Sequence, residues 1–152
     1  MAKEPGSLGP LEEFESRPSF HMAFPVTDLE AARNFYVDTL GCREGRSDER
    51  WADFNFFGFQ ITAHLVDSNE LLGANAVDEH DIPVPHFGLI MSWEDWHRAV
   101  DHLTYIGVDF KVEPHIRFKG KTGEQATFFV SDPSGNCLEF KAFKSPGDVF
   151  AK

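Results

Sequence analysis

The stretch that decides the fold of this chain is HMAFPVTDLEAARNFY, residues 21–36. It opens with a run that is typical of a strand and has His21 near its start. Thr27 and Glu30 follow in a Thr-x-x-Glu pattern, which predicts a capping box at the start of a helix. Apolar residues then recur at helical spacing until Gly41, a residue type that commonly ends helices. The stretch therefore predicts a strand that leads directly into a helix.

The same succession of patterns returns in the second half of the chain. Residues 85–91 have the pattern of a strand and contain His86, and Ser92 begins a second helix-like segment. Ser92 lies six residues after His86 (92 − 86 = 6), just as Thr27 lies six residues after His21 (27 − 21 = 6). The two histidines therefore occupy the same place in two copies of one structural unit.

Three strands are expected after each helix, which makes the chain two βαβββ modules of an α+β fold. The expected strands are residues 19–26, 42–45, 50–56 and 60–66, then 85–91, 108–112, 126–131 and 136–143. The predicted organisation is a flexible tail at 1–18, a first module at 19–67, a connector at 68–83, a second module at 84–143 and a C-terminal tail at 144–152. With 152 residues in all, one compact domain is expected.

Composition narrows the classes of function. Hydrophobic residues make up 41% of the chain, which is the globular range, and the formal net charge is −11. A chain this acidic is repelled by phosphate groups, so nucleic acid and anionic membrane surfaces are not expected as partners. Residues 1–18 do not have the pattern of a secretory signal, and two cysteines fit a reducing compartment. We therefore expect a cytoplasmic protein that acts on a small molecule.

The closing strands of the two modules correspond as well. Four residues after the glycine that precedes each strand, the first module has Thr62 and the second has Glu139. If a pseudo-twofold axis relates the modules, Thr62, Glu139 and the two repeated histidines converge on one cleft. A single histidine is usually structural, and a strand shifted by one residue would point Glu139 to solvent. The repeat favours the other interpretation, a divalent metal ion bound by His21, His86 and Glu139.

Three segments carry a resemblance to a known family: residues 21–36, then PHFG at 85–88, then DPSGNCLE at 132–139. Over residues 19–143 the chain resembles the vicinal oxygen chelate superfamily of glyoxalases, bleomycin- and fosfomycin-resistance proteins and extradiol dioxygenases. The resemblance implies two βαβββ modules whose curved mixed sheets surround a metal cleft. It also implies that the metal ligands are His21, His86 and Glu139.

The chain departs from one branch of that family at Thr62. Glyoxalase I enzymes have a fourth ligand, a glutamate, where this chain has Thr62. Two histidines and one carboxylate form the facial triad of non-haem Fe(II) oxygenases. The ligand set therefore resembles that of extradiol dioxygenases, and Fe(II) is the expected ion. Mn, Ni or Zn remain alternatives, because fosfomycin-resistance enzymes also use two histidines and one glutamate.

Residues near the predicted ion supply candidates for catalysis and substrate binding. Residues 60, 62 and 64 share one face of a strand because side chains alternate. We expect His64 to act as the catalytic base, with Gln60 and Thr62 in contact with substrate. A loop predicted at 113–125 would lie over the cleft. Its candidate substrate contacts are His115, Arg117 and Glu124.

Three functions stay open at this stage. The leading hypothesis is an extradiol-type dioxygenase acting on a small aromatic or enediol-like substrate. The first alternative is a lyase, isomerase or thiol transferase using Zn, Ni or Mn, as in glyoxalase and fosfomycin resistance. It gains weight because Phe128 and Phe129 stand where extradiol dioxygenases carry a tyrosine. The second alternative is a binding protein without catalysis. A homodimer is expected, and the cleft could form within one chain or between two.

Overall fold

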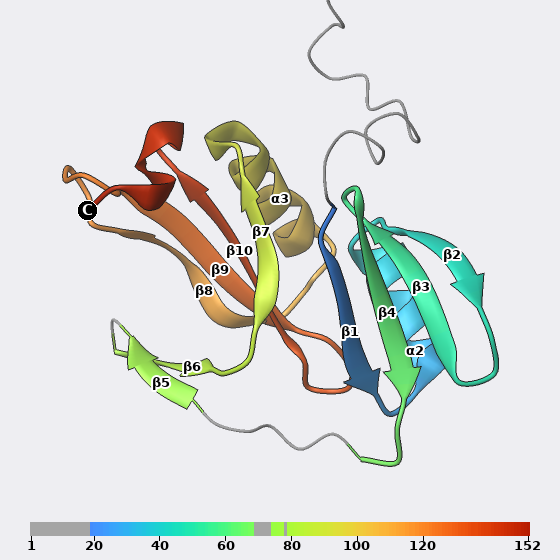
Figure 1. Cartoon of the computed structure of the whole chain (residues 1–152). Helices are drawn as coiled ribbons and strands as arrows, with labels where there is room; N and C mark the ends of the chain where they lie inside the picture. The colour runs from blue at the N-terminus through green and yellow to red at the C-terminus, as the bar shows by residue number, and fades with distance from the viewer. Residues whose placement is uncertain (1–18, 69–73, 78) are drawn as a thin grey trace, which may run out of the picture.

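The computed structural model describes residues 19–68, 74–77 and 79–152, and the predicted tail at 1–18 lies outside them. Two four-stranded sheets, each with a helical segment, make up the protein (Figure 1). The first is built from β1 (His21–Val26), β2 (Arg43–Ser47), β3 (Trp51–Phe56) and β4 (Phe59–Leu65), and the second from β7 (Phe87–Met91), β8 (Phe110–Arg117), β9 (Gln125–Ser131) and β10 (Cys137–Phe143). The predicted α+β fold of two βαβββ modules with open, curved mixed sheets is confirmed.

The strand order places the first and last strand of each module side by side. The orders are β1-β4-β3-β2 and β7-β10-β9-β8, and both the β1–β4 and the β7–β10 pairs are parallel. In the first module Ala23 pairs with Thr62, and in the second Gly88 pairs with Glu139. Ala23 and Gly88 each lie two residues after a repeated histidine. Thr62 and Glu139 therefore occupy equivalent positions, as the spacing in the sequence predicted.

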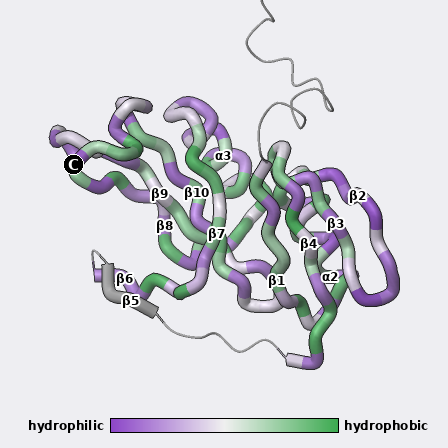
Figure 2. The backbone as a smooth tube through the Cα atoms, in the orientation of Figure 1, coloured by the Kyte–Doolittle hydropathy of each residue, from purple (hydrophilic) through white to green (hydrophobic). Residues whose placement is uncertain are grey.

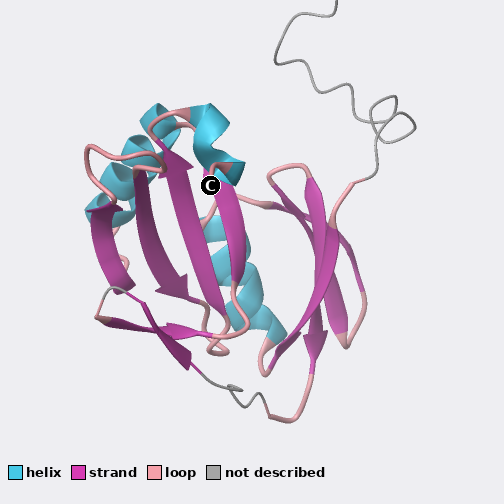
Figure 3. Ribbon diagram, turned by 60° about the vertical axis from the view of Figure 1, so that its left-hand side comes forward, coloured by secondary structure: helices cyan, strands magenta, loops and turns pink. Residues whose placement is uncertain are grey.

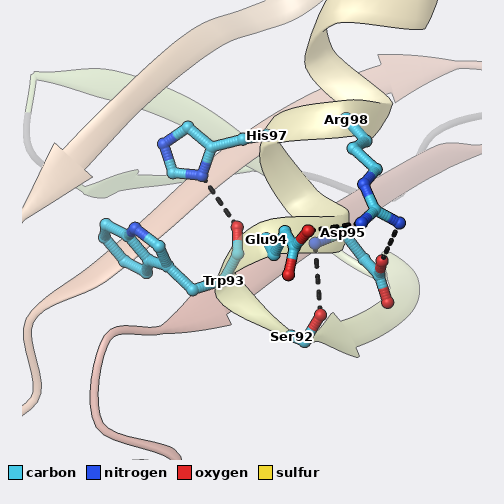
Figure 4. Close-up of polar contacts among 6 residues, drawn as sticks. All are labelled: Ser92, Trp93, Glu94, Asp95, His97 and Arg98. Carbon is cyan, nitrogen blue, oxygen red and sulfur yellow. Dashed lines mark hydrogen bonds and ion pairs between the residues drawn. The ribbon is translucent and has the colours of Figure 1, made fainter.

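The helices begin at caps that differ between the modules. Ser92 caps α3 (Trp93–Tyr105) by accepting a hydrogen bond from the backbone N–H of Asp95 at 3.1 Å, as predicted (Figure 4). The capping box predicted at Thr27 is wrong, because Asp28 caps α2 (Leu29–Arg33) and accepts from the N–H of Ala31. Instead, the backbone N–H of Thr27 donates to Ser134 Oγ in the second module. α2 continues into the π-helix η1 (Asn34–Thr39).

Two segments have regular structure that the sequence pattern did not predict. The predicted connector holds a small antiparallel sheet of β5 (Ala74–Val77) and β6 (His80–Pro83), and the predicted C-terminal tail holds the 3₁₀-helix η2 (Pro146–Phe150). The strand predicted at 108–112 continues as β8 to Arg117, so much of the predicted loop at 113–125 is a strand. Two register shifts in the β8–β9 pair explain this error, because bulges break the alternation that identifies a strand.

The larger of two hydrophobic clusters among the described residues joins the two modules, and the smaller one consists of Ile82, Val112, Phe129 and Cys137. The larger cluster, the common core, contains the alternate residues Phe24, Phe54 and Phe56 of the first sheet and Phe128 and Phe140 of the second, together with buried residues of the helices. The rings pack across the module boundary, with Phe56 5.9 Å from Phe87 and 6.2 Å from Phe140 between centroids. Hydrophobic and hydrophilic residues follow one another along the strands (Figure 2). Helical segments lie between the two sheets (Figure 3). Each sheet therefore has one face in the common core and one face directed away from it.

The turn between β9 and β10 fastens the modules together. Buried Asp132 accepts hydrogen bonds from the Tyr36 hydroxyl at 2.8 Å, from the N–H groups of Ser134 and Asn136, and from the Asn136 amide. The same amide donates to the Pro25 carbonyl at 2.7 Å. Burial and the neighbouring Asp132 raise the pKa of Tyr36, so its hydroxyl stays a donor. Asp132 thus links a turn of the second module to the helix of the first.

None of the helices in the described part of the chain is long and apolar enough to span a membrane.

Removing the Asp132 carboxylate should destabilise the whole chain. We expect Asp132→Ala to lower the free energy of unfolding by about 3 kcal/mol, because buried donors left without a partner cost about 1–3 kcal/mol each. Tyr36→Phe removes a single bond of the same network and should cost about 1 kcal/mol. Urea unfolding of both variants measures this. An Asp132→Ala protein as stable as the unaltered one would show that this turn does not join the modules.

Candidate metal centre

His86 is held from both sides by the second module and the connector. It lies just before β7, and its Nδ1 is 2.8 Å from the carbonyl oxygen of Pro83, at the end of β6. Its Nε2 is 3.1 Å from Glu139 Oε2 on β10. When Nδ1 donates its hydrogen to a backbone carbonyl, Nε2 is the nitrogen that remains to bind an ion. Pro83 therefore orients the ring toward Glu139.

Glu139 is a half-buried carboxylate with a partner at each oxygen. Its Oε1 accepts a hydrogen bond from the Thr127 hydroxyl at 2.9 Å, and its Oε2 faces His86. Burial acts to raise the pKa of Glu139, but the hydrogen bonds from His86 and Thr127 and the charge of Lys141 hold it below its ordinary value. The carboxylate is therefore ionised and fixed in orientation, which is what metal binding requires.

The electrostatics of His86 are consistent with a position for a cation. The hydrogen bond to Glu139 raises the pKa of His86, against the effect of burial. Both ring nitrogens face oxygen atoms, the Pro83 carbonyl at Nδ1 and the Glu139 carboxylate at Nε2. Two ligand atoms at right angles on an ion with bonds of about 2.1 Å lie roughly 3.0 Å apart. The 3.1 Å separation of Nε2 and Oε2 fits such an ion.

Gly88 allows the strand that follows His86 to approach Glu139. A Cβ atom built on Gly88 would lie 1.6 Å from the carbonyl oxygen of Glu139, so no side chain fits there. Gly88 pairs with Glu139 in the parallel β7–β10 ladder. The glycine in the PHFG segment is therefore required by the close approach of β7, which follows His86, to β10, which carries Glu139.

The first module presents its own polar face, away from the common core. His21, Gln60 and His64 are exposed on this face, whereas Thr62 is buried, with 7% of its surface exposed. Parallel pairing of β1 with β4 puts His21 beside Gln60, one rung from Thr62. This is the same relation that His86 has to Glu139, so the predicted common face of residues 60, 62 and 64 exists.

Asp53 is a member of this face that the sequence analysis missed. It lies opposite Thr62 on β3 and accepts hydrogen bonds from the Thr62 hydroxyl at 2.6 Å and from the Gln60 amide at 3.1 Å. The signal was present in residues 51–56 (WADFNF), where Ala, Phe and Phe alternate with Trp, Asp and Asn. That alternation puts Asp53 on the polar side of the sheet.

The structure brings together two of the three predicted ligands within one chain. Across residues 19–68, 74–77 and 79–152, no group of three or more His, Cys, Asp or Glu side chains could hold an ion. His21 is therefore not beside His86 and Glu139. The reason is the shared core, because both polar faces are directed away from it. The complete ligand set stays a prediction.

The other candidate contacts lie on or beside the second sheet. His115 is in β8, and its ring lies 5.2 Å from that of His80, between centroids. The Arg117 guanidinium lies 4.8 Å from the centroid of the Phe118 ring. Glu124 is buried and accepts a hydrogen bond from the Gly120 N–H at 2.6 Å, which lowers its pKa. These contacts show local roles, and substrate binding by His115, Arg117 and Glu124 stays a prediction.

Comparison with known protein families agrees with this architecture. The model of the Glyoxalase/Bleomycin resistance protein/Dioxygenase superfamily matches residues 19–140. The chain belongs to this superfamily. The match spans both modules and all three predicted ligands, so membership rests on the whole fold.

Solved structures of the superfamily share the fold. A glyoxalase/bleomycin resistance protein/dioxygenase from Alicyclobacillus acidocaldarius is 32% identical, with a TM-score of 0.73 over 87% of this chain and 96% of that one. The fosfomycin resistance protein FosX from Listeria monocytogenes is 19% identical, with a TM-score of 0.63 over 87% and 97% of the two chains. Lactoylglutathione lyase from Agrobacterium tumefaciens is 15% identical, with a TM-score of 0.61 over 90% and 98%. Comparison with curated proteins finds no match.

Substitution of Gly88 tests whether the close approach of β7 and β10 keeps His86 beside Glu139. We expect Gly88→Ala to lower the free energy of unfolding by about 2 kcal/mol or more, since the added methyl group must push β7 away from β10. Gly147 provides the matched control, because a Cβ there meets no atom within 4 Å. Thermal unfolding of both variants decides the matter. Equal melting temperatures for Gly88→Ala and Gly147→Ala would contradict the close approach.

Proposed function

We propose that this protein is a metal-dependent enzyme of the superfamily, with Fe(II) bound by His86 and Glu139 of one chain and His21 of another. The observation that carries the proposal is the His86–Glu139 pair, an oriented imidazole and an ionised carboxylate 3.1 Å apart. A half-buried carboxylate is costly without a positive partner, and an ion shared with His86 removes that cost. The residues present fit a divalent ion.

A second copy of the chain would complete this centre. Each chain has a half-site with His86 and Glu139 on one polar face and an exposed His21 on the other, and the shared core keeps the two faces apart. If the first module of one copy covers the second module of another, each dimer contains two equivalent centres. A homodimer of this kind also covers both polar faces.

Within such a centre the chain's own residues position and deprotonate the substrate. A bound ion would supply Lewis acidity and a redox centre for two vicinal oxygen atoms. Three protein ligands leave positions for substrate, since Thr62 stands where glyoxalase I enzymes have a fourth ligand, a glutamate. His64 lies on the same face as Thr62 and is the proposed base that removes a hydroxyl proton. The reaction class that we propose is extradiol-type oxygenation of a catechol-like substrate.

One observation favours a second reaction class. Phe129 lies directly across the strand pair from Glu139, and its ring packs against that of His86 at 5.2 Å between centroids. This wall of the centre therefore has no phenolic hydroxyl, which extradiol dioxygenases carry before the carboxylate ligand. A lyase, isomerase or thiol transferase using Zn, Ni or Mn does not need that hydroxyl. Relatives of similar fold include fosfomycin resistance proteins and a lactoylglutathione lyase.

Metal analysis of anaerobically purified protein tests the ligand set. We expect about one Fe(II) per chain, and a loss of more than tenfold in affinity for His21→Ala, His86→Ala and Glu139→Ala. His102→Ala, at an exposed position of α3, is the control and should bind normally. Unaltered protein that binds none of Fe, Mn, Ni or Zn would refute the centre and support a binding protein without catalysis.

Mixed dimers test whether the centre is shared. Chains with His21→Ala and chains with Glu139→Ala each lack a ligand, and neither homodimer should bind metal. A mixed dimer, however, contains one intact centre if sites form between chains, so we expect half of the normal metal content. Centres formed within single chains would give none.

Substrate assays separate the two reaction classes. Protein loaded with Fe(II) and given a panel of catechols should consume O₂, and His64→Gln should reduce the rate by about 10²-fold or more. Turnover of epoxide or hemithioacetal substrates with Mn, Ni or Zn in the absence of O₂ would instead favour the lyase or transferase.

A further inference from the structure

The polar face of the first module contains a hydrogen-bond chain that none of the roles above uses. Asp53 Oδ1 accepts from the Thr62 hydroxyl at 2.6 Å, and its Oδ2 accepts from the Gln60 amide at 3.1 Å. Gly45 on β2 borders Asp53 on its other side, where a Cβ would lie 3.4 Å from the Asp53 Cβ. The carboxylate is therefore fixed in orientation by two donors.

The hydrogen bond to Asp53 determines whether the Thr62 hydroxyl can donate to a ligand or accept from it. A hydroxyl has one hydrogen and two lone pairs, and the hydrogen of Thr62 is directed to Asp53. Thr62 Oγ1 can therefore only accept a hydrogen bond from a ligand on this face. A group that meets Thr62 must carry a donor such as a hydroxyl.

The strand register places Thr62 near the proposed ion. His21 and Thr62 are related as His86 and Glu139 are, and the latter two side chains are in contact. A ligand bound at the ion beside His21 therefore lies within reach of the Thr62 hydroxyl. His64 lies one further rung along β4.

We propose that Asp53, acting through Thr62, is the proton acceptor for a hydroxyl group of the substrate. The proposal rests on the function proposed above and adds a second proton acceptor to it, because a catechol-like substrate has two hydroxyl protons, of which His64 takes one and Asp53 the other. It assigns to this site a ligand with an ionisable hydroxyl next to the atom that binds the metal. Thr62 is the catalytic residue that touches the substrate, and Asp53 receives the proton.

The proton transfer balances without any other reactant. The substrate O–H bond breaks as its hydrogen passes to Thr62 Oγ1, and the original Thr62 O–H bond breaks as that hydrogen passes to Asp53 Oδ1. Thr62 is unchanged, the substrate oxygen becomes an anion, and Asp53 becomes a neutral acid. The other titratable or charged groups that the register places on this face are His21, His64 and Arg43, and the bulge in β2 places Arg46 opposite Asp53.

The test uses the Fe(II)-loaded protein under anaerobic conditions with 4-nitrocatechol, whose absorbance changes when its hydroxyls ionise. The measured quantity is the pH at which half of the bound probe is doubly ionised. Asp53→Asn and Thr62→Val should each raise that pH by about one unit, a tenfold weaker deprotonation. Thr62→Ser retains the hydroxyl and should behave as the unaltered protein does.

Metal content and unfolding temperature are measured on every variant, so that loss of the ion or of the fold is recognised separately. A midpoint unchanged in Asp53→Asn and Thr62→Val, with metal bound, would overturn the proposal. A shift in His64→Gln alone would do the same, because His64 would then be the acceptor for both hydroxyl protons. An absorbance that does not change on mixing the probe with iron-loaded protein would also overturn it, whereas failure of the unaltered protein to bind iron would refute the metal centre itself.

Discussion

The parallel pairing of the first and last strand in each module is the constraint on which the rest of the structure depends. It sets residues that are far apart in the chain side by side, as with His86 and Glu139, which are 53 positions apart (139 − 86 = 53) and 3.1 Å apart in space. The pairing is close enough at Gly88 that a single methyl group would not fit. Because the same pairing occurs in both modules, a histidine on one strand and a functional position on its neighbour recur twice.

The common core is the second constraint, and it decides where a centre can form. Aromatic rings from both sheets pack together on the helical side, and the Asp132 turn fastens the modules in that arrangement. Both polar faces then point away from each other. In the proposed centre, one chain therefore supplies two half-sites, one with the His86–Glu139 pair and one with His21 on the face that carries Asp53 and Thr62. A second copy of the chain is the complement that we propose.

Local hydrogen bonding distinguishes the two half-sites chemically. Around Glu139, the donors are arranged to keep a carboxylate ionised and directed at His86. Around Thr62, the carboxylate belongs to Asp53 on the neighbouring strand, and the Thr62 hydroxyl donates a hydrogen bond to it. The first half-site is suited to holding a cation, and the second to accepting a proton from whatever the cation binds.

The sequence by itself determined the duplicated βαβββ pattern, the equivalent positions of the two histidines, the equivalence of Thr62 with Glu139 and the family. The first three follow from periodicity and spacing, which are properties of the chain read along its length, and the family follows from the resemblance of residues 21–36, 85–88 and 132–139 to the vicinal oxygen chelate superfamily. Four other features were decided by the tertiary structure alone. Thr27 contacts Ser134 of the second module and does not cap a helix, and β8 extends through bulges. Asp53 lies opposite Thr62, and His21 is separated from His86 and Glu139 within one chain. These depend on which face of each sheet enters the shared core and on which strands become neighbours, and no local pattern contains that information.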